Sequence, residues 1–162
     1  MTAAPLWTPS AARVAATQAV AFMQQASARS GTPLASYRDL HAWSLAEPAA
    51  FWELVWDFCG VIGEKGSAEV RDADRMPGAK FFPEARLNFA ENLLRRDDAG
   101  LAMIFRGEDK AESTVTWAGL GALVSRLQQA LQAAGAGVGD RVAAMLPNLP
   151  ETIALMLAVT SL

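Results

Sequence analysis

The spacing of apolar residues changes about three fifths of the way along the chain. Up to residue 96, apolar positions recur every three or four residues, as on one face of a helix, and glycine or proline interrupts the pattern. This spacing predicts helices over 10–28 and 36–43, and a third helix that begins at Pro48. Proline suits the first turn of a helix, where N–H groups have no intrahelical partner, and Glu47 or Ser44 is the expected cap.

The third predicted helix is apolar around most of its circumference. Four residues share one face at i, i+3, i+4 and i+7, namely Phe51, Leu54, Val55 and Phe58. Trp52 and Trp56 occupy an adjacent face, which leaves only Glu53 and Asp57 for water. Such a helix must be packed between other elements, so we interpret its aromatic residues as core packing and not as a cofactor site.

The segment after this helix is polar and rich in glycine and proline. Residues 60–78 are therefore expected to form a solvated loop. Asp72 and Asp74 could suggest a metal site, but the sequence around them offers no further ligand pattern, so they are interpreted as part of this loop. The residues 81–83 (Phe-Phe-Pro) predict an extended joint, and 88–94 predict one or two helical turns.

Beyond residue 96, strands and helices are expected to alternate. Short apolar runs predict a hairpin formed by 101–105 and 113–115. Thr116 is the expected N-cap of a helix that runs to about Ala133, with Gly135 as its stop.

A further strand and helix are expected at the end of the sequence. Residues 141–146 predict a strand, and Asn148 with Glu151 resembles a capping box, with Pro150 in the first turn of the helix. The loop 146–148 lies where α/β sheets tend to bind ligands, but capping explains Asn148 equally well.

The expected fold class is therefore α/β. A helical N-terminal region over 1–96 is followed, over 97–162, by the first strands and helices of a larger domain whose sheet is incomplete. The glycines of 135–139 resemble part of a dinucleotide-binding loop, but such a loop leaves a strand and enters a helix. Here a helix ends and a strand is expected to begin, so we interpret these glycines as a helix stop and a tight turn.

Composition narrows the class of protein further. The 162 residues are 52% apolar and 19% charged, which excludes a disordered chain, and the net charge of −3 gives no attraction to nucleic acid or anionic membranes. The most apolar run, 152–162, is shorter than the ~20 residues of a membrane span. The N-terminus is predicted to be an ordinary helix and not a secretory signal or transit peptide. A soluble protein is expected.

Few residues are candidates for chemistry. The single cysteine, Cys59, excludes an internal disulfide framework, and the single histidine, His41, has no second histidine or cysteine with which to hold a metal. Both are interpreted as structural or surface residues. This inventory fits a reducing, cytoplasmic environment.

Three stretches resemble the N-terminal part of acyl-CoA synthetases of the adenylate-forming superfamily. They are 51–58 (FWELVWDF), 81–94 (FFPEARLNFAENLL) and 139–152 (GDRVAAMLPNLPET). The second stretch, together with 6–10 (LWTPS), is similar to the acetoacetyl-CoA synthetases within that superfamily. The family usually has tryptophan where Phe81 stands and glycine where Glu84 stands. The second departure puts a side chain into a turn and makes an altered local geometry the expectation.

The resemblance implies a two-step reaction in which acetoacetate and ATP form an acyl-adenylate and coenzyme A then takes the acyl group as a thioester. ATP, Mg²⁺ and coenzyme A are the implied cofactors. No stretch here matches the family's phosphate loop, its aromatic-acid motif, its ribose-binding aspartate or its C-terminal lysine. No catalytic, cofactor-binding or metal-binding residue is therefore predicted, and the chain is expected to be an N-terminal fragment that is inactive alone. Its partners would be acetoacetate and the remainder of the ligase chain.

Three alternatives stay open at this point. The chain can be a fragment of an acetyl- or propionyl-CoA synthetase, which differ in the acyl acid. It can be a free-standing helical interaction module whose apolar faces bind a partner, as the low charge allows. The third alternative, a small nucleotide-binding protein, predicts saturable binding of ATP with Mg²⁺.

Overall fold

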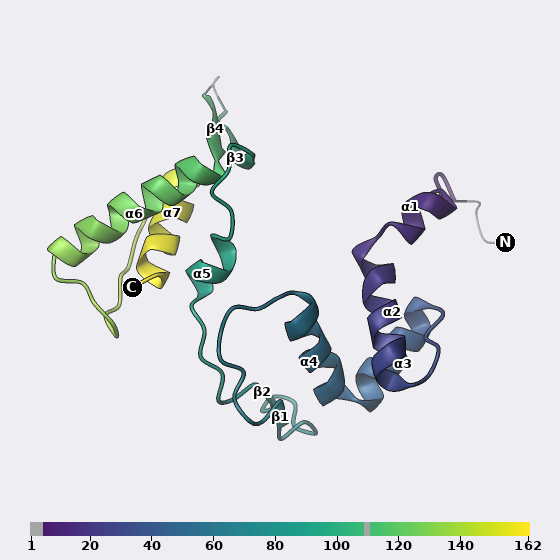
Figure 1. The fold of residues 1–162 in the computed structure, drawn as a ribbon. Helices are drawn as coiled ribbons and strands as arrows, with labels where there is room; N and C mark the ends of the chain where they lie inside the picture. The colour runs from purple at the N-terminus through teal and green to yellow at the C-terminus, as the bar shows by residue number, and fades with distance from the viewer. Residues whose placement is uncertain (1–4, 109–110) are drawn as a thin grey trace. The chain divides into compact units, whose positions relative to one another are not determined.

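The structure is a computed structural model that describes residues 5–108 and 111–162. It divides into two compact units, Met1–Arg86 and Leu87–Leu162, and each is described by itself. Figure 1 shows the order of the elements along the chain. Helices dominate the first unit, and the second combines a hairpin with helices.

Four helices begin the first unit: α1 (Ala11–Ala15), α2 (Gln18–Ser30), α3 (Tyr37–Ala46) and α4 (Pro48–Phe58). The prediction of one continuous helix over 10–28 is wrong because Thr17 interrupts it. The Thr17 hydroxyl donates to the carbonyl of Val14 and accepts from the N–H of Val20, so one side chain ends α1 and caps α2. Gly31 ends α2 in a left-handed conformation.

The next two helices begin at local signals. Ser36 and Asp39 form a capping box at the start of α3, which continues to Ala46, three residues beyond the predicted end. Pro48 occupies the first turn of α4, as predicted. Glu47 is its N-cap residue, but the Glu47 side chain makes no capping hydrogen bond.

Helix α4 is packed on two sides, as its apolar circumference requires. On the inner side, Leu54 joins Ala26 and Leu40 in the buried core, and Phe51 packs edge-on against Phe22 with ring centroids 5.7 Å apart. On the outer side Trp52 and Trp56 contact aromatic residues of the following segment. The packing there is looser, since 40% of the surface of Trp52 is exposed.

The expected loop over 60–78 and the joint after it form a small folded ribbon. Strands β1 (Val70–Arg71) and β2 (Lys80–Phe81) pair antiparallel, with Val70 opposite Phe81. Asp72 and Asp74 are exposed, as predicted. The joint at 81–83 is not simply extended, because Phe82 has a φ of 44° and bends the chain after β2.

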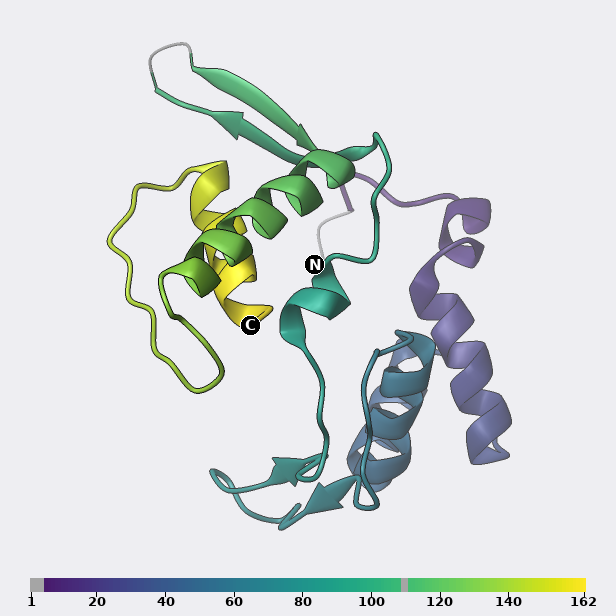
Figure 2. The ribbon, with the colours of Figure 1, turned by 60° about the vertical axis from the view of Figure 1, so that its left-hand side comes forward.

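The second unit contains α5 (Phe89–Leu93), β3 (Leu101–Arg106), β4 (Glu112–Thr116), α6 (Trp117–Ala133) and α7 (Pro150–Thr160). Figure 2 shows the β3–β4 hairpin running directly into α6. The hairpin and the bounds of α6 agree with the prediction, since the Thr116 hydroxyl accepts from the N–H of Gly119 and the chain turns at Gly135, with φ of 90°. The buried core lies between α5, α6 and α7, and it comprises Ala90, Leu120, Val124, Ala154, Leu157 and Ala158.

Two predictions near the end of the chain are wrong. Residues 141–146 form no strand, and within the part of the chain that the structure describes no other segment pairs with them. A strand needs a neighbour to satisfy its backbone groups, so apolar pattern alone does not make one. The N-cap of α7 is Leu149 and not Asn148, without a side-chain bond. Thr152 fixes this turn instead, because its hydroxyl donates to the carbonyl of Pro147 at 2.6 Å.

Candidate functional site

The residues singled out for chemistry are dispersed. His41 lies on α3 with its ring stacked on Tyr37 at 6.4 Å between centroids, and Cys59 is exposed just after α4. Within residues 5–108 and 111–162, no group of three or more histidine, cysteine, aspartate or glutamate residues could hold a metal ion. Of the three lysines, Lys110 lies outside the described residues.

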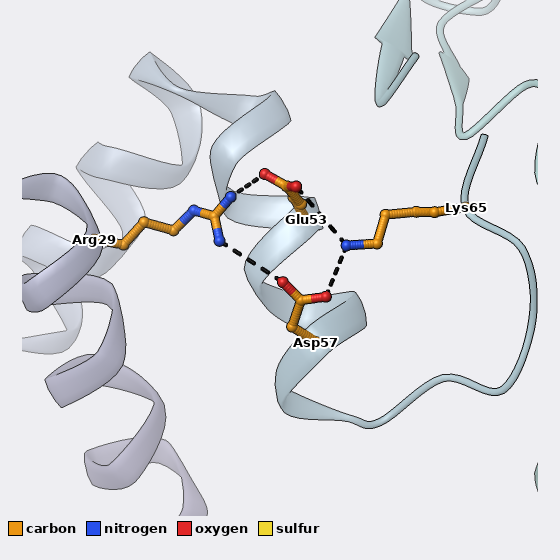
Figure 3. A network of polar contacts seen from close by, with 4 residues as sticks. All are labelled: Arg29, Glu53, Asp57 and Lys65. Atoms are coloured by element: carbon orange, nitrogen blue, oxygen red, sulfur yellow. Dashed lines mark hydrogen bonds and ion pairs between the residues drawn. The ribbon is translucent and has the colours of Figure 1, made fainter. Parts of the chain in front are cut away.

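The largest group of interacting charges joins three segments of the first unit (Figure 3). Arg29 on α2 forms an ion pair with Glu53 of α4, and its second terminal nitrogen lies 3.7 Å from Oδ2 of Asp57. Lys65, beyond α4, places Nζ 2.7 Å from Oδ1 of Asp57 and 3.8 Å from Oε1 of Glu53. We call these four residues the charge network.

The charge network explains how two acidic residues share one helix face. Glu53 and Asp57 stand at i and i+4 on α4, where like charges destabilise a helix unless cations lie nearby. Arg29 and Lys65 each contact both carboxylates, so every charge has an opposite partner. The side chains remain a quarter to a half exposed, which limits each pair to ~1 kcal/mol or less. The network therefore fastens segments together and presents no unpaired acid or base.

A second polar group is centred on Glu84. Its Oε2 accepts hydrogen bonds from the N–H of Ser67 at 3.0 Å and from the Ser67 hydroxyl at 2.7 Å, and its Oε1 pairs with Arg71. The bonds from Ser67, followed by the charge of Arg71, lower the pKa of the Glu84 carboxyl.

Position 84, where the family usually has glycine, carries Glu84 here, and a glycine, Gly66, lies opposite it across the ribbon. Glu84 does not adopt a positive φ; Gly66 does, at 80°. A Cβ on Gly66 would lie 2.6 Å from the Cβ of Glu84, which is closer than two carbon atoms that are not bonded to each other approach. The side chain at 84 is thus accommodated by a glycine at 66.

In the second unit, Asp98 and Arg96 hold the start of α6. Oδ2 of Asp98 accepts from Nε of Arg96 at 2.8 Å, and Oδ1 accepts from the N–H of Gly100 at 2.6 Å. Arg96 also lies over the ring of Trp117, 5.4 Å from its centroid. The N–H of Ala118 donates to the carbonyl of Asp98, which satisfies one of the free donors of the helix terminus. The bond from Arg96, then that from Gly100, lowers the pKa of Asp98 to about 2.

Asp98 should make the second unit sensitive to acid in a defined window. Because its pKa in the folded chain, about 2, lies below the ordinary 3.8, its stabilising effect is complete above about pH 4 and is lost as the pH falls toward 2. We expect an NMR titration of the Asp98 carboxyl carbon to give a midpoint near 2. The substitution Arg96→Gln should raise that midpoint toward 3.8, whereas a midpoint near 3.8 in the unaltered chain would contradict the geometry described.

Three hollows on the surface show which of the polar residues described above lie next to open space. One hollow, of about 690 Å³, is lined partly by Arg29 and Asp39, but Arg29 is paired with Glu53, and Asp39 accepts the capping bonds of Ser36. A groove of about 450 Å³ between 142–146 and α7 is lined mainly by apolar side chains. A third, of about 260 Å³, places Asn148 beside β3, so the loop 146–148 borders a small open hollow.

Sequence models of two families match the chain. The model described as acetyl-coenzyme A synthetase N-terminus matches residues 37–93, and the model described as AMP-binding enzyme matches residues 91–162. An acetoacetyl-coenzyme A synthetase of Rhizobium meliloti (strain 1021) is 57% identical over 97% of this chain and 24% of its own length. A malonamoyl-CoA synthetase of Penicillium aethiopicum is 36% identical over 97% of this chain and 22% of its own length.

A solved structure agrees with these matches. The acetoacetyl-CoA synthetase of Streptomyces lividans superposes with a TM-score of 0.84 at 36% identity, over 98% of this chain and 25% of that one. The chain therefore matches the AMP-binding acyl-CoA synthetases, and its fold is that of their N-terminal region, with helices first and incomplete sheets. Within this family it matches the acetoacetyl-CoA synthetases over nearly its whole length. It spans about a quarter of the length of these relatives.

The glycine-rich stretch that resembles part of a dinucleotide-binding loop does not have the geometry of one. The glycines of 135–139 follow α6 and lead into the irregular segment 141–146, so they do not form a loop between a strand and a helix N-terminus. None of the helices in the described ranges is long and apolar enough to cross a membrane.

Sequence reasoning missed both polar groups of the first unit. One signal for the charge network was available, since two acids at i and i+4 on an apolar helix call for cations from elsewhere. Nothing in the sequence indicated that Arg29 and Lys65 would supply them, because both approach α4 from other segments.

Proposed function

We propose that this chain serves as the N-terminal part of an acetoacetate–CoA ligase. In that reaction acetoacetate and ATP give acetoacetyl-adenylate and pyrophosphate, and coenzyme A then takes the acyl group as a thioester with release of AMP. The observation that carries the proposal is the 57% identity to the Rhizobium meliloti acetoacetyl-coenzyme A synthetase over 97% of the chain.

In this proposal the chain contributes scaffold and no catalytic residue. Residues 1–96 form the helical N-terminal region and 97–162 begin the AMP-binding α/β domain. ATP, Mg²⁺ and coenzyme A act in the rest of the ligase and are not held tightly by this chain; the mutual pairing of Arg29, Lys65, Glu53 and Asp57 supports this part of the proposal. The proposed location is the cytoplasm, with no nucleic-acid or membrane partner.

A replacement experiment tests the proposal. Residues 1–162 would take the place of the corresponding quarter of the Rhizobium meliloti enzyme, and AMP release would be followed with coenzyme A and each acyl acid in turn. We expect activity with acetoacetate comparable to that of the parent. A soluble, folded chimera without activity would contradict the proposal.

Acetate, propionate and malonamate serve as control acids, the last because a malonamoyl-CoA synthetase of Penicillium aethiopicum is among the relatives. Because the rest of the chimera comes from the Rhizobium meliloti enzyme, its preference for acetoacetate over these acids should match that of the parent. The 162-residue chain alone is expected to show no thioester formation above background. Activity of the isolated chain, or saturable binding of ATP by calorimetry, would refute its assignment as scaffold.

A further inference from the structure

Residues 64–86 form a closed segment that lies outside the core of the first unit, and we call it the strap. Its two ends are joined, because the N–H of Glu64 donates to the carbonyl of Arg86 at 2.8 Å and the N–H of Arg86 donates back at 2.9 Å. Between these ends the β1–β2 pair forms the ribbon, and the N–H of Phe82 donates to the carbonyl of Glu69 at 2.7 Å.

None of the strap's residues is buried. All of them are exposed or half-buried, and the buried core of this unit consists of Ala26, Leu40 and Leu54 from the helices. Segments that bury few apolar groups open at a lower free energy than the core they lie against. The helices α2, α3 and α4 therefore have a core that does not depend on the strap.

The strap is attached to one helix by a small set of contacts. Lys65 joins it to Asp57 and Glu53, while Phe81 packs against Trp52 at 5.4 Å and Phe82 against Trp56 at 5.0 Å between ring centroids. All four partners lie on α4. A segment held along a single helix can separate from it without disturbing the packing of that helix on α2 and α3.

Inside the strap, Glu84 is the main cross-connection. Its carboxylate holds Ser67 and Arg71, which lie on the opposite arm of the ribbon, and Gly66 provides the space for its Cβ. These bonds link the two arms, so the strap keeps its own shape by polar contacts and not by a core.

From these contacts we infer that the strap is one cooperative opening unit: it separates from α4 and loses its internal hydrogen bonds together, while the helices stay folded, and Lys65 holds it to α4 and Glu84 holds its two arms together. Opening exposes the faces of Trp52 and Trp56. Because the Lys65 pairs are partly exposed, added salt screens them and favours the open form.

Hydrogen exchange on the 162-residue chain tests this inference. The N–H groups of Glu64, Phe82 and Arg86 all donate within the strap, so they should exchange together and faster than the interior amides of α2 and α4. Lys65→Gln should speed all three by about two- to fivefold, the equivalent of an exposed ion pair, and leave α2 unchanged. Lys80→Gln is the matched control, since Lys80 lies on the same strap and is exposed.

Glu84→Gln provides an independent arm, because the polar partners of Glu84, Ser67 and Arg71, both lie within the strap. It should speed the same three amides by at least about threefold through the loss of charge-assisted bonds. The inference would be overturned if the three amides exchanged at the rate of the helices, if either Lys65→Gln or Glu84→Gln accelerated only one of them, or if Lys80→Gln had the same effect. Equal acceleration of α2 by Lys65→Gln would also overturn it, since the helices would then open with the strap.

Discussion

Leu157→Ala should destabilise the second unit by about 2–5 kcal/mol, the range observed for leucine-to-alanine changes in a packed core. The Leu157 side chain is 2% exposed and lies in the cluster where α7 packs against α6 and α5. Truncation leaves a cavity, because Ala154 and Ala158 in the same cluster are fully buried and their side chains are too small to reach into the vacated space. Urea titration with hydrogen exchange of the α6 amides measures the loss for this unit alone.

Met145→Ala is the matched control for that experiment. Met145 belongs to the same unit but is 99% exposed, so its truncation should change the free energy of unfolding by no more than about 0.5 kcal/mol. A similar loss for both variants would mean that the packing of α6, α5 and α7 does not provide the stability of this unit.

Gly66→Ala should destabilise the strap by about 1–3 kcal/mol. Two separate causes act together. The φ of 80° at position 66 is unfavourable for any residue with a Cβ, and the new Cβ would meet that of Glu84 at 2.6 Å. The free energy of opening, taken from the exchange of the Glu64, Phe82 and Arg86 amides, gives the size of the effect.

A double-mutant cycle separates the two causes. Glu84→Gly removes the clashing Cβ but not the unfavourable φ, so Gly66→Ala should cost less in the Glu84→Gly background than in the original chain. Gly137→Ala is the control, because nothing lies within 4 Å of its new Cβ. Equal costs in both backgrounds would mean that the close approach to Glu84 plays no part.

The sequence predicted best those elements whose ends are decided locally. Thr116 and Gly135 bound α6 as expected, because a capping hydroxyl and a left-handed glycine act within one turn of the chain. The same local chemistry explains an error, since Thr17 is also a capping residue and it divides the helix predicted over 10–28. At this point the capping side chain, and not the apolar pattern, decides where the helix ends.

Elements that depend on distant partners were predicted poorly. Residues 141–146 have the composition of a strand but no neighbour with which to pair in the described structure. The strands β1 and β2 are each two residues long, which is too short for an alternation of apolar and polar residues to be visible in the sequence. The polar groups around Asp57 and Glu84 likewise join residues 8 and 17 positions apart, which no local pattern encodes.

The charge network has a consequence for how this region can evolve. Each acid on α4 is matched by cations from two other segments, so reversing the sign at any one of the four positions leaves a like-charged neighbour that the remaining three cannot neutralise. Positions 29, 53, 57 and 65 are therefore expected to drift as a correlated set, through neutral intermediates such as glutamine. Three separate stretches of the chain inherit one shared constraint on their mutations.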